Sequence, residues 1–230
     1  MLFRSPADVR LNPDLPLEIL NRFGIDRDRP ILFGGSTHAG EEEVLGEIFQ
    51  RLQANFPAIT LIIAPRHVER VGEIRTRLAR LGLDVGLRTE AGAARTSAPD
   101  CVLLDSTGEL QDWYAVATIV FVGKSLTARG GQNPVEPILA GKPVLFGPHM
   151  ENFSALAHAL VANEAAIQIH DPNSLHEKIA WLLRDREAAL RLVANAQAVL
   201  ESHSGATGRT ARLVLNLESA ARRRKEAIGK

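Results

Sequence analysis

Short runs of apolar, often β-branched residues alternate along this chain with longer segments in which apolar residues recur at helical spacing. The apolar runs predict strands at residues 31–33, 59–64, 84–87, 101–104, 118–122, 143–146 and 166–169. The other segments predict helices at residues 17–23, 41–55, 68–81, 108–115, 134–140, 152–163, 174–184, 187–202 and 207–228. Strands without polar alternation are buried on both faces, so the pattern predicts an α/β fold, a Rossmann-like parallel sheet flanked by helices.

The length and composition suit one globular domain with a short lead-in. With 230 residues, of which 45% are hydrophobic and 23% charged, the chain can bury a sizeable core, which excludes a disordered or fibrous protein. Residues 1–29, rich in proline, are expected to be a lead-in or the remnant of a linker. Residues 30–230 are expected to form one Rossmann-like domain that includes the C-terminal helices.

Charge and cysteine content narrow the class of ligand and the compartment. The 27 Lys and Arg balance the 27 Asp and Glu, so no global field favours nucleic acid, and any phosphate site must be local. The single cysteine, Cys101, cannot form an internal disulfide, which indicates a reducing, cytoplasmic setting. No Cys and His spacing suits zinc, and we expect no metal ion and no cofactor. No run approaches the ~20 apolar residues that a membrane span needs.

Polar residues follow the predicted strands where each strand ends. In a parallel sheet with right-handed crossovers, these carboxyl ends lie along one edge, where open α/β sheets bind ligands. The residues placed at that edge are 34–38, 65–67, 105–109, 123–125, 129–136 and 147–149. They are rich in glycine, hydroxyl groups, histidine and charge, whereas the opposite strand ends carry ordinary turn signals. The sequence therefore predicts a site for a polar ligand at this edge.

The segment after the first predicted strand, residues 34–40, has two interpretations. As a Gly-Gly-Ser-Thr turn that opens a helix, it would leave backbone N–H groups free to hold an anion. Alternatively, Thr37 caps the helix, and the glutamates at 41–43 complement the helix dipole. The spacing fits neither a Walker loop nor a dinucleotide fingerprint.

Pro65 and Arg66 directly follow the second predicted strand. This position fixes a guanidinium at the sheet edge, where it suits bidentate contact with phosphate or carboxylate. An exposed arginine in a turn is the plainer alternative. His67 could meet His38 above the edge, although a structural role is commoner than a catalytic one for each histidine.

Two helices are expected to begin at the same edge. Asn133 suits an N-cap, Pro134 the first helical position and Glu136 the third position of a capping box. Gly130 and Gly131 before them allow close approach of a ligand to the backbone, and Glu136 could also accept hydrogen bonds from sugar hydroxyls. Residues 105–109 form a second start of this kind, with Ser106 or Thr107 as the cap.

Two charged motifs outside this edge have plain explanations. Asp26 and Asp28 form a DxD pair that we interpret as a solvated turn rather than a cation site. The basic run 222–225 is interpreted as an exposed helix end, with contact to anionic lipid as the alternative.

Taken together in chain order, these motifs resemble the carboxyl-terminal half of the 3-deoxy-D-manno-octulosonic acid (Kdo) transferases. The resemblance runs from about Pro30 to the end of the chain. It rests on STHAGEEE at 36–43, PRH at 65–67, DSTGEL at 105–110, FVGKSL at 121–126, GGQNPVE at 130–136 and GKPVLFGPH at 141–149, followed by Asn152 and Phe153.

Members of that family have two facing Rossmann-like domains, the GT-B arrangement, and move Kdo from CMP-Kdo to lipid A precursors without a metal. The resemblance implies that this chain is the donor-binding half. Nine residues would then contact CMP-Kdo: Pro65, Arg66, Thr107, Gly108, Glu109, Asn133, Pro134, Val135 and Glu136. Further candidates are Ser36, Thr37, His38, Lys124, Gly131 and Gln132.

The resemblance also implies that the acceptor surface and the catalytic base lie in an amino-terminal domain with no counterpart here. We therefore expect no catalytic residue in this chain, and binding of CMP or CMP-Kdo without transfer by the chain alone. For the full-length enzyme it implies a lipid A precursor as acceptor, peripheral contact at the cytoplasmic face of the inner membrane, and a role in lipopolysaccharide synthesis.

The chain departs from the family pattern at three positions. Many members have histidine in place of Gln132 and glycine in place of Lys124, and Thr107 replaces a commonly apolar residue. Two other functions are compatible with the same motifs: the donor half of a GT-B enzyme that uses a UDP-sugar, and a non-enzymatic module that binds sugar nucleotides.

Overall fold

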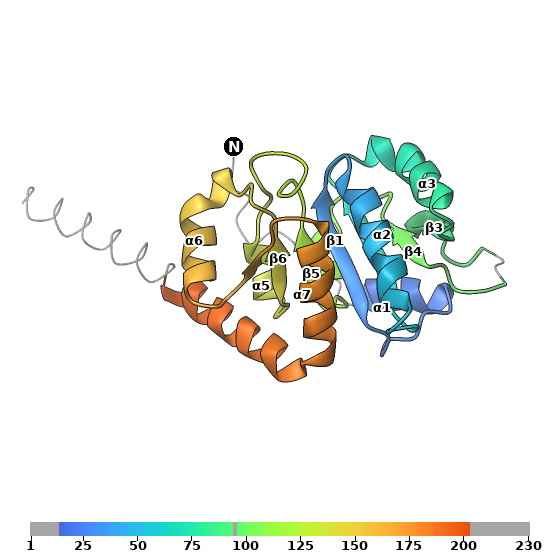
Figure 1. The fold of residues 1–230 in the computed structure, drawn as a ribbon. Coiled ribbons are helices and arrows are strands. Elements are labelled where there is room, and N and C mark those ends of the chain that lie inside the picture. The colour runs from blue at the N-terminus through green and yellow to red at the C-terminus, as the bar shows by residue number, and fades with distance from the viewer. Residues whose placement is uncertain (1–13, 94–95, 203–230) are drawn as a thin grey trace, which may run out of the picture.

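A seven-stranded parallel sheet forms the centre of the molecule (Figure 1). The computed structural model describes residues 14–93 and 96–202. The strands, in the spatial order β3-β4-β2-β1-β5-β6-β7, are β1 (Ile31–Thr37), β2 (Thr60–Pro65), β3 (Val85–Leu87), β4 (Cys101–Leu103), β5 (Ile119–Val122), β6 (Val144–Phe146) and β7 (Ile167–Gln168). Each overlaps a predicted strand, so the expected Rossmann-like α/β fold is confirmed.

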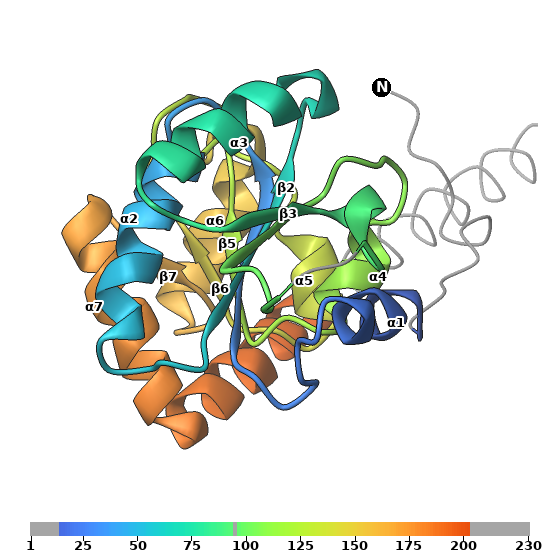
Figure 2. The ribbon, with the colours of Figure 1, turned by 90° about the vertical axis from the view of Figure 1, so that its right-hand side faces the viewer.

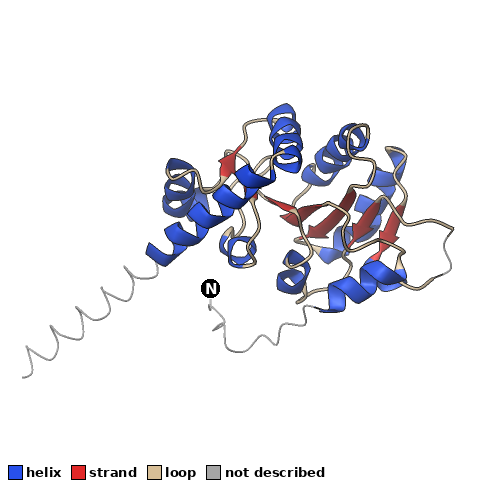
Figure 3. Cartoon of the chain, turned by 90° about the horizontal axis from the view of Figure 1, so that it is seen from below, coloured by secondary structure: helices blue, strands red, loops and turns tan. Residues whose placement is uncertain are grey.

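Helices cover both faces of this sheet (Figures 1 and 2). They are α1 (Asp14–Arg22), α2 (Glu41–Gln53), α3 (Val71–Arg80), α4 (Leu110–Tyr114), α5 (Val135–Leu139), α6 (Ser154–Ala162) and α7 (Pro172–Arg184), and residues 186–202 are also helical. Three short 3₁₀ helices lie at Val68–Arg70, Arg88–Glu90 and Glu151–Phe153. Figure 3 shows the strands enclosed between helices when the molecule is seen from below.

Alternate residues of the central strands pack into two separate cores. In β1, Ile31 and Phe33 face the core formed with α1, α4, α5 and α6, whereas Leu32 faces the core formed with α2, α3 and α7. This double burial explains why the strands read as continuous apolar runs. The side chains of Ile19 and Leu20 in α1 are part of the first core. The domain boundary at residue 29 stays a prediction.

Strand β1 lies at the point where the chain switches from one half of the sheet to the other. It pairs with β2 on one side and with β5 on the other. In open α/β sheets, the crevice above such a switch point is the usual place for a ligand. The fold therefore directs attention to the carboxyl ends of β1, β2, β4 and β5.

The turn predicted after residue 33 is wrong, because β1 continues to Thr37. A Cβ on Gly34 would stand 2.6 Å from Leu45 of α2, and a Cβ on Gly35 would stand 2.7 Å from the Tyr114 hydroxyl of α4. Both glycines therefore let helices pack directly on the strand, and neither forms an open anion-binding turn.

Two predictions made from the sequence fall outside the described residues. These are the helix expected at residues 207–228 and the basic run 222–225. Among residues 14–93 and 96–202, no helix is both long and apolar enough to cross a membrane.

Candidate functional site

A cavity of about 110 Å³ opens at the carboxyl ends of β1, β2 and β4. Its lining consists of Ser36, Ala64, Pro65, Arg66, Val68, Leu104, Ser106, Thr107, Gly108, Glu109 and Leu110. Five of the nine residues predicted to hold the donor, and Ser36 from the further candidates, therefore line this one cavity, although they come from three segments of the sequence. We call this cavity the edge pocket.

Arg66 contributes an exposed positive charge to the edge pocket. Its main-chain N–H donates to the Thr37 carbonyl at 3.0 Å, which extends the β1–β2 pairing and fixes its backbone directly after β2. Its side chain is exposed and forms no hydrogen bond or ion pair with any described residue. A guanidinium held at a sheet edge without an internal partner is available for an anionic ligand.

Glu109, which also lines the edge pocket, is held in a fixed position. Arg88 donates to its carboxylate through Nε at 3.0 Å and through Nη2 at 2.7 Å. The Ser106 hydroxyl donates to the same carboxylate at 3.1 Å. Helix α4 begins after Glu109, so the prediction that Ser106 or Thr107 caps this helix is wrong. The exposed Thr107 and Gly108 form the turn between Ser106 and Glu109, and Gly108 has a φ of 88°.

The predicted helix start at 133–136 is present but differs in detail. Helix α5 begins at Val135, whose N–H donates to the Asn133 side-chain oxygen at 3.0 Å. The residue that precedes the helix is Pro134, so the predicted places of Asn133 as N-cap, Pro134 as first residue and Glu136 as third residue are each wrong by one position. The Asn133 side-chain amide donates to Glu136 at 3.4 Å, and no capping box of the expected form is present. None of the residues from 133 to 136 lines the edge pocket. Pro134 is buried, whereas Asn133, Val135 and Glu136 are half-buried.

The buried phenol of Tyr114 connects this helix to the end of β1. Burial raises the pKa of Tyr114, and the nearby carboxylate of Glu136 acts in the same direction. The Tyr114 hydroxyl lies against Gly35 of β1.

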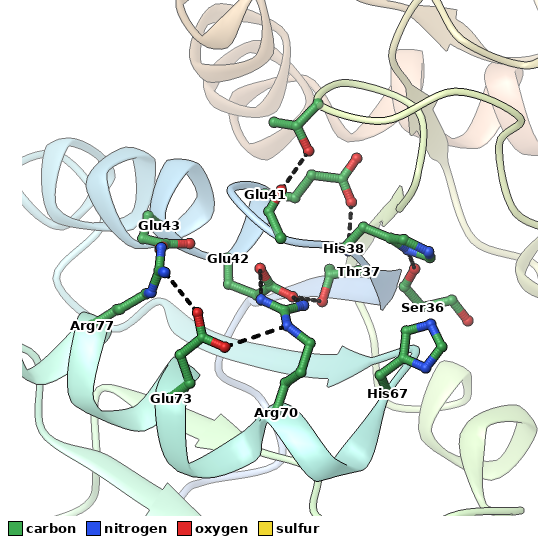
Figure 4. A network of polar contacts seen from close by, with 12 residues as sticks. Ser36, Thr37, His38, Glu41, Glu42, Glu43, His67, Arg70, Glu73 and Arg77 are labelled. Atoms are coloured by element: carbon green, nitrogen blue, oxygen red, sulfur yellow. Dashed lines mark hydrogen bonds and ion pairs between the residues drawn. The ribbon is translucent and has the colours of Figure 1, made fainter.

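The start of α2 is organised around the buried carboxylate of Glu41 (Figure 4). This carboxylate accepts main-chain N–H bonds from His38 and Lys124, both at 2.8 Å, from Ser125 at 2.9 Å and from Leu126 at 3.0 Å. Of these four amides, only that of His38 belongs to the segment that the sequence offered as an anion site, and the protein's own carboxylate occupies it. The preceding residues 34–37 belong to β1, so the open turn expected there is not present.

Thr37 does not cap α2, contrary to one interpretation of the sequence. The residue preceding the helix is Gly40, with a φ of 89°, and no side chain caps it. The fully buried Thr37 hydroxyl donates instead to Glu42 at 3.1 Å. Arg70 also donates to Glu42 at 3.0 Å. Burial raises the pKa of Glu42, and the Arg70 contact opposes that rise.

The two histidines of the edge meet as expected. The rings of His38 and His67 are 5.6 Å apart between centroids, with an angle of 77° between their planes (Figure 4). Burial lowers the pKa of His38, while the Ser36 carbonyl, 3.4 Å from its Nδ1, opposes the change.

The sequence reasoning missed the bonding roles of three residues that organise the edge, Ser125, Glu151 and Glu41. Ser125 is fully buried, and its hydroxyl donates to the Val122 carbonyl at 2.5 Å and accepts from the Gly147 N–H at 2.8 Å. Glu151 accepts from the Gly130 N–H at 2.7 Å. Their partners lie 3 to 85 positions away in sequence, and most of these contacts leave no local pattern.

The remaining candidates lie on or beside the loop after β5, residues 123–131, which we call the edge loop. Lys124 and Gln132 are half-buried, and Gly131 is buried against Met150. The Gly131 N–H donates to the Lys124 carbonyl at 2.9 Å, and the Gln132 N–H donates to the Gly123 carbonyl at 3.1 Å. Within the part of the chain that the structure describes, no group of three or more His, Cys, Asp or Glu side chains could hold a metal ion.

Comparison with known proteins gives a consistent set of relatives. No protein-family profile matches the chain. It is 32% identical over 184 residues to 3-deoxy-D-manno-octulosonic acid transferase of Haemophilus influenzae, covering 80% of this chain and 43% of that protein. It is also 32% identical over 206 residues to the Bordetella pertussis transferase of the same name, covering 88% of this chain and 48% of that protein. The chain thus spans about half the length of these relatives.

Solved structures agree with the sequence relatives. The C-terminal CMP-Kdo binding domain of WaaA from Acinetobacter baumannii superimposes with a TM-score of 0.74 at 28% identity, covering 82% of this chain and 97% of that domain. Anabaena HepE in complex with UDP-glucose has a TM-score of 0.56 at 16% identity, which shows the shared fold. The predicted resemblance is therefore confirmed, and the chain corresponds in sequence and fold to the carboxyl-terminal half of the Kdo transferases.

Proposed function

We propose that this chain binds CMP-Kdo in the edge pocket and acts as the donor half of a Kdo transferase. One observation carries the proposal: the edge pocket gathers Arg66, whose guanidinium has no partner among the described residues, with the exposed turn at Thr107 and Gly108 and with Glu109. The relatives named above supply the identity of the nucleotide sugar.

The charges of the edge pocket suit a nucleotide monophosphate. Arg66 can form a bidentate contact with phosphate oxygens. Glu109 is held by Arg88, so its carboxylate keeps one orientation and can accept hydrogen bonds from sugar or ribose hydroxyls. Glu136, on the neighbouring helix α5, offers a second carboxylate for the same kind of contact.

For the whole enzyme, we propose transfer of Kdo to a lipid A precursor at the cytoplasmic face of the inner membrane. An acceptor hydroxyl, held by a second domain, would form a bond to the anomeric carbon of Kdo as the bond from that carbon to CMP breaks. A carboxylate of the second domain would take the hydroxyl proton. Arg66 would offset the charge of the departing CMP, which is the contribution of this chain to the reaction.

The test is a calorimetric titration of the chain with CMP, repeated for Arg66→Ala and Glu136→Ala. Loss of a charge-assisted contact is expected to weaken CMP binding about tenfold in Arg66→Ala. Arg80→Ala, which removes an exposed arginine at the far end of α3, is the matched control and should bind as the wild type does.

Two results would contradict the proposal. One is the absence of CMP binding at millimolar concentration. The other is selective stabilisation by UDP in a thermal-shift comparison of CMP, UDP and GDP, which would favour a transferase that uses a UDP-sugar.

A further inference from the structure

Backbone strain is concentrated where β1 and β5 meet. The non-glycine residues with positive φ in the described chain are Ser36 at 53°, Lys124 at 56° and Glu164 at 50°. Ser36 and Lys124 are close in space, because a Cβ on Gly123 would collide with the Ser36 carbonyl oxygen. Left-handed conformations of ordinary residues persist only where the surroundings impose them, and they cluster at ligand sites.

The surroundings that impose this conformation on Lys124 are identifiable. Its N–H and the N–H of His38 both donate to the same oxygen of Glu41, each at 2.8 Å. Its carbonyl accepts from the Gly131 N–H at 2.9 Å. The main chain of Lys124 is therefore fixed on both sides, directly beside His38.

The ammonium of Lys124, in contrast, has no partner within the described residues. It forms no hydrogen bond or ion pair there, although the residue is half-buried. The neighbouring acid, Glu41, is fully buried, and its two oxygens already accept four main-chain N–H groups. Glu41 thus fixes the lysine backbone without pairing with its ammonium.

The neighbours of Lys124 form a row of basic side chains across the sheet edge. His38 follows β1, and its ring contacts His67, which is adjacent to Arg66 after β2. Burial lowers the pKa of His38 and the charge of Lys124 acts in the same direction, while the Ser36 carbonyl and Glu41 oppose the change. Adjacent strands are ~4.8 Å apart, which puts the ends of β2 and β5 about 10 Å apart across β1.

We propose that Lys124 binds the carboxylate of the donor's acidic sugar while Arg66 binds its phosphate. This inference rests on the proposed function and narrows it, because the edge would then select a nucleotide sugar that carries a second anionic group. A neutral sugar would leave the Lys124 ammonium unpaired, and the strained backbone of Lys124 would hold its side chain ready for the carboxylate.

The test compares two ligands on the complete 230-residue chain: CMP, which has the phosphate alone, and CMP-Kdo, which has both anionic groups. Lys124→Gly should weaken CMP-Kdo binding roughly tenfold or more and leave CMP binding within about twofold, because only the sugar contact is lost. Glycine also accepts the left-handed conformation, so the melting temperature should stay the same or rise. Lys124→Arg should retain most of the preference for CMP-Kdo. Lys178→Ala, which removes a lysine from α7, is the control.

Three other results of these titrations would overturn the contact between Lys124 and the sugar carboxylate. An equal loss for CMP and CMP-Kdo in Lys124→Gly would assign Lys124 to the phosphate and overturn the carboxylate contact. Unchanged CMP-Kdo binding, or wild-type binding of CMP-Kdo no tighter than that of CMP, would also overturn it. In these cases the proposed function still stands if Arg66→Ala weakens the binding of CMP. If the wild type binds neither ligand, both proposals fail.

Discussion

The two halves of the sheet edge use their polar groups in opposite ways. In the edge pocket, Arg66 is exposed without an internal partner among the described residues, and Thr107 and Gly108 are open to solvent. Around the edge loop, the polar groups are turned inward, because Glu41 and Ser125 accept main-chain N–H bonds and are fully buried. On the proposed function, polar side chains that are exposed or without an internal partner serve binding, whereas the fully buried ones hold the main chain in place.

This difference shows how a ligand site can be preorganised. A buried acceptor that satisfies several N–H groups holds a loop in one conformation, since each unsatisfied donor would carry a desolvation penalty. A loop fixed in this way presents its remaining groups at constant positions, which lowers the entropy lost on binding. Mutation of the buried acceptors Glu41 and Ser125 is expected to act through stability, whereas mutation of side chains without an internal partner among the described residues, Arg66 and Lys124, is expected to act through affinity.

The largest effect is expected for Glu41→Ala. It leaves four main-chain N–H donors without their acceptor, three on the edge loop and that of His38 after β1, which should lower the free energy of unfolding by about 4 kcal/mol, at about 1 kcal/mol for each donor. Urea denaturation measures this. Glu47→Ala, which removes an exposed glutamate from the same helix, is the control, and a loss no larger than that of the control would show that water replaces Glu41 at little cost.

The second largest loss of stability is expected for Arg70→Ala, and this loss should depend on pH. The buried Glu42 loses its cation, which should lower the free energy of unfolding by about 3 kcal/mol at neutral pH. The pKa of Glu42 is already raised in the folded state, and removal of Arg70 raises it further. Below the unfolded pKa, Glu42 is protonated in both states and the variant loses little; the loss grows as pH rises from there through the folded pKa.

The measurement is the difference in unfolding free energy between Arg70→Ala and the wild type at pH 5 and at pH 8. Arg77→Ala removes an arginine whose partners Glu43 and Glu73 are partly exposed, and it should show a small and nearly constant difference. A difference for Arg70→Ala that is larger at pH 5 than at pH 8 would refute the assignment of Glu42 as the titrating group.

A smaller loss is expected for Ser125→Ala. The hydroxyl donates to the Val122 carbonyl and accepts from the Gly147 N–H, so its removal leaves a buried donor and a buried acceptor unpaired. We expect a decrease of about 2 kcal/mol in the free energy of unfolding. Ser154→Ala, which removes an exposed hydroxyl at the first residue of α6, is the control, and equal stability of the two variants would contradict the structural role of the edge loop.

The sequence predicted much of this arrangement because the fold depends on local patterns. Every strand was found from its apolar run, and the polar segments expected at the carboxyl edge follow the strands there, since parallel topology brings strand ends together. The contact between His38 and His67 was likewise foreseen from the strand ends alone.

What the sequence could not supply is the partner of each polar group. Glu41 has the pattern of a helix-dipole residue, yet three of its N–H donors lie 83 to 85 positions further along the chain. Gly34 and Gly35 have the pattern of an anion-binding turn, but their neighbours Leu45 and Tyr114 explain them as packing positions in a longer strand. Such roles are decided by tertiary contacts.

The smallest effect on stability is expected at Arg66, which we propose to bind the phosphate. Arg66→Ala removes an exposed side chain without a partner among the described residues, so the free energy of unfolding should change by less than about 0.5 kcal/mol. Together with Ser125→Ala it forms a reciprocal pair, since one variant should lose affinity for CMP at constant stability and the other should lose stability. Urea denaturation of Arg66→Ala measures whether its stability is unchanged. A loss of stability close to that of Ser125→Ala would mean that Arg66 has a structural partner, and the contrast between the two halves of the edge would then disappear.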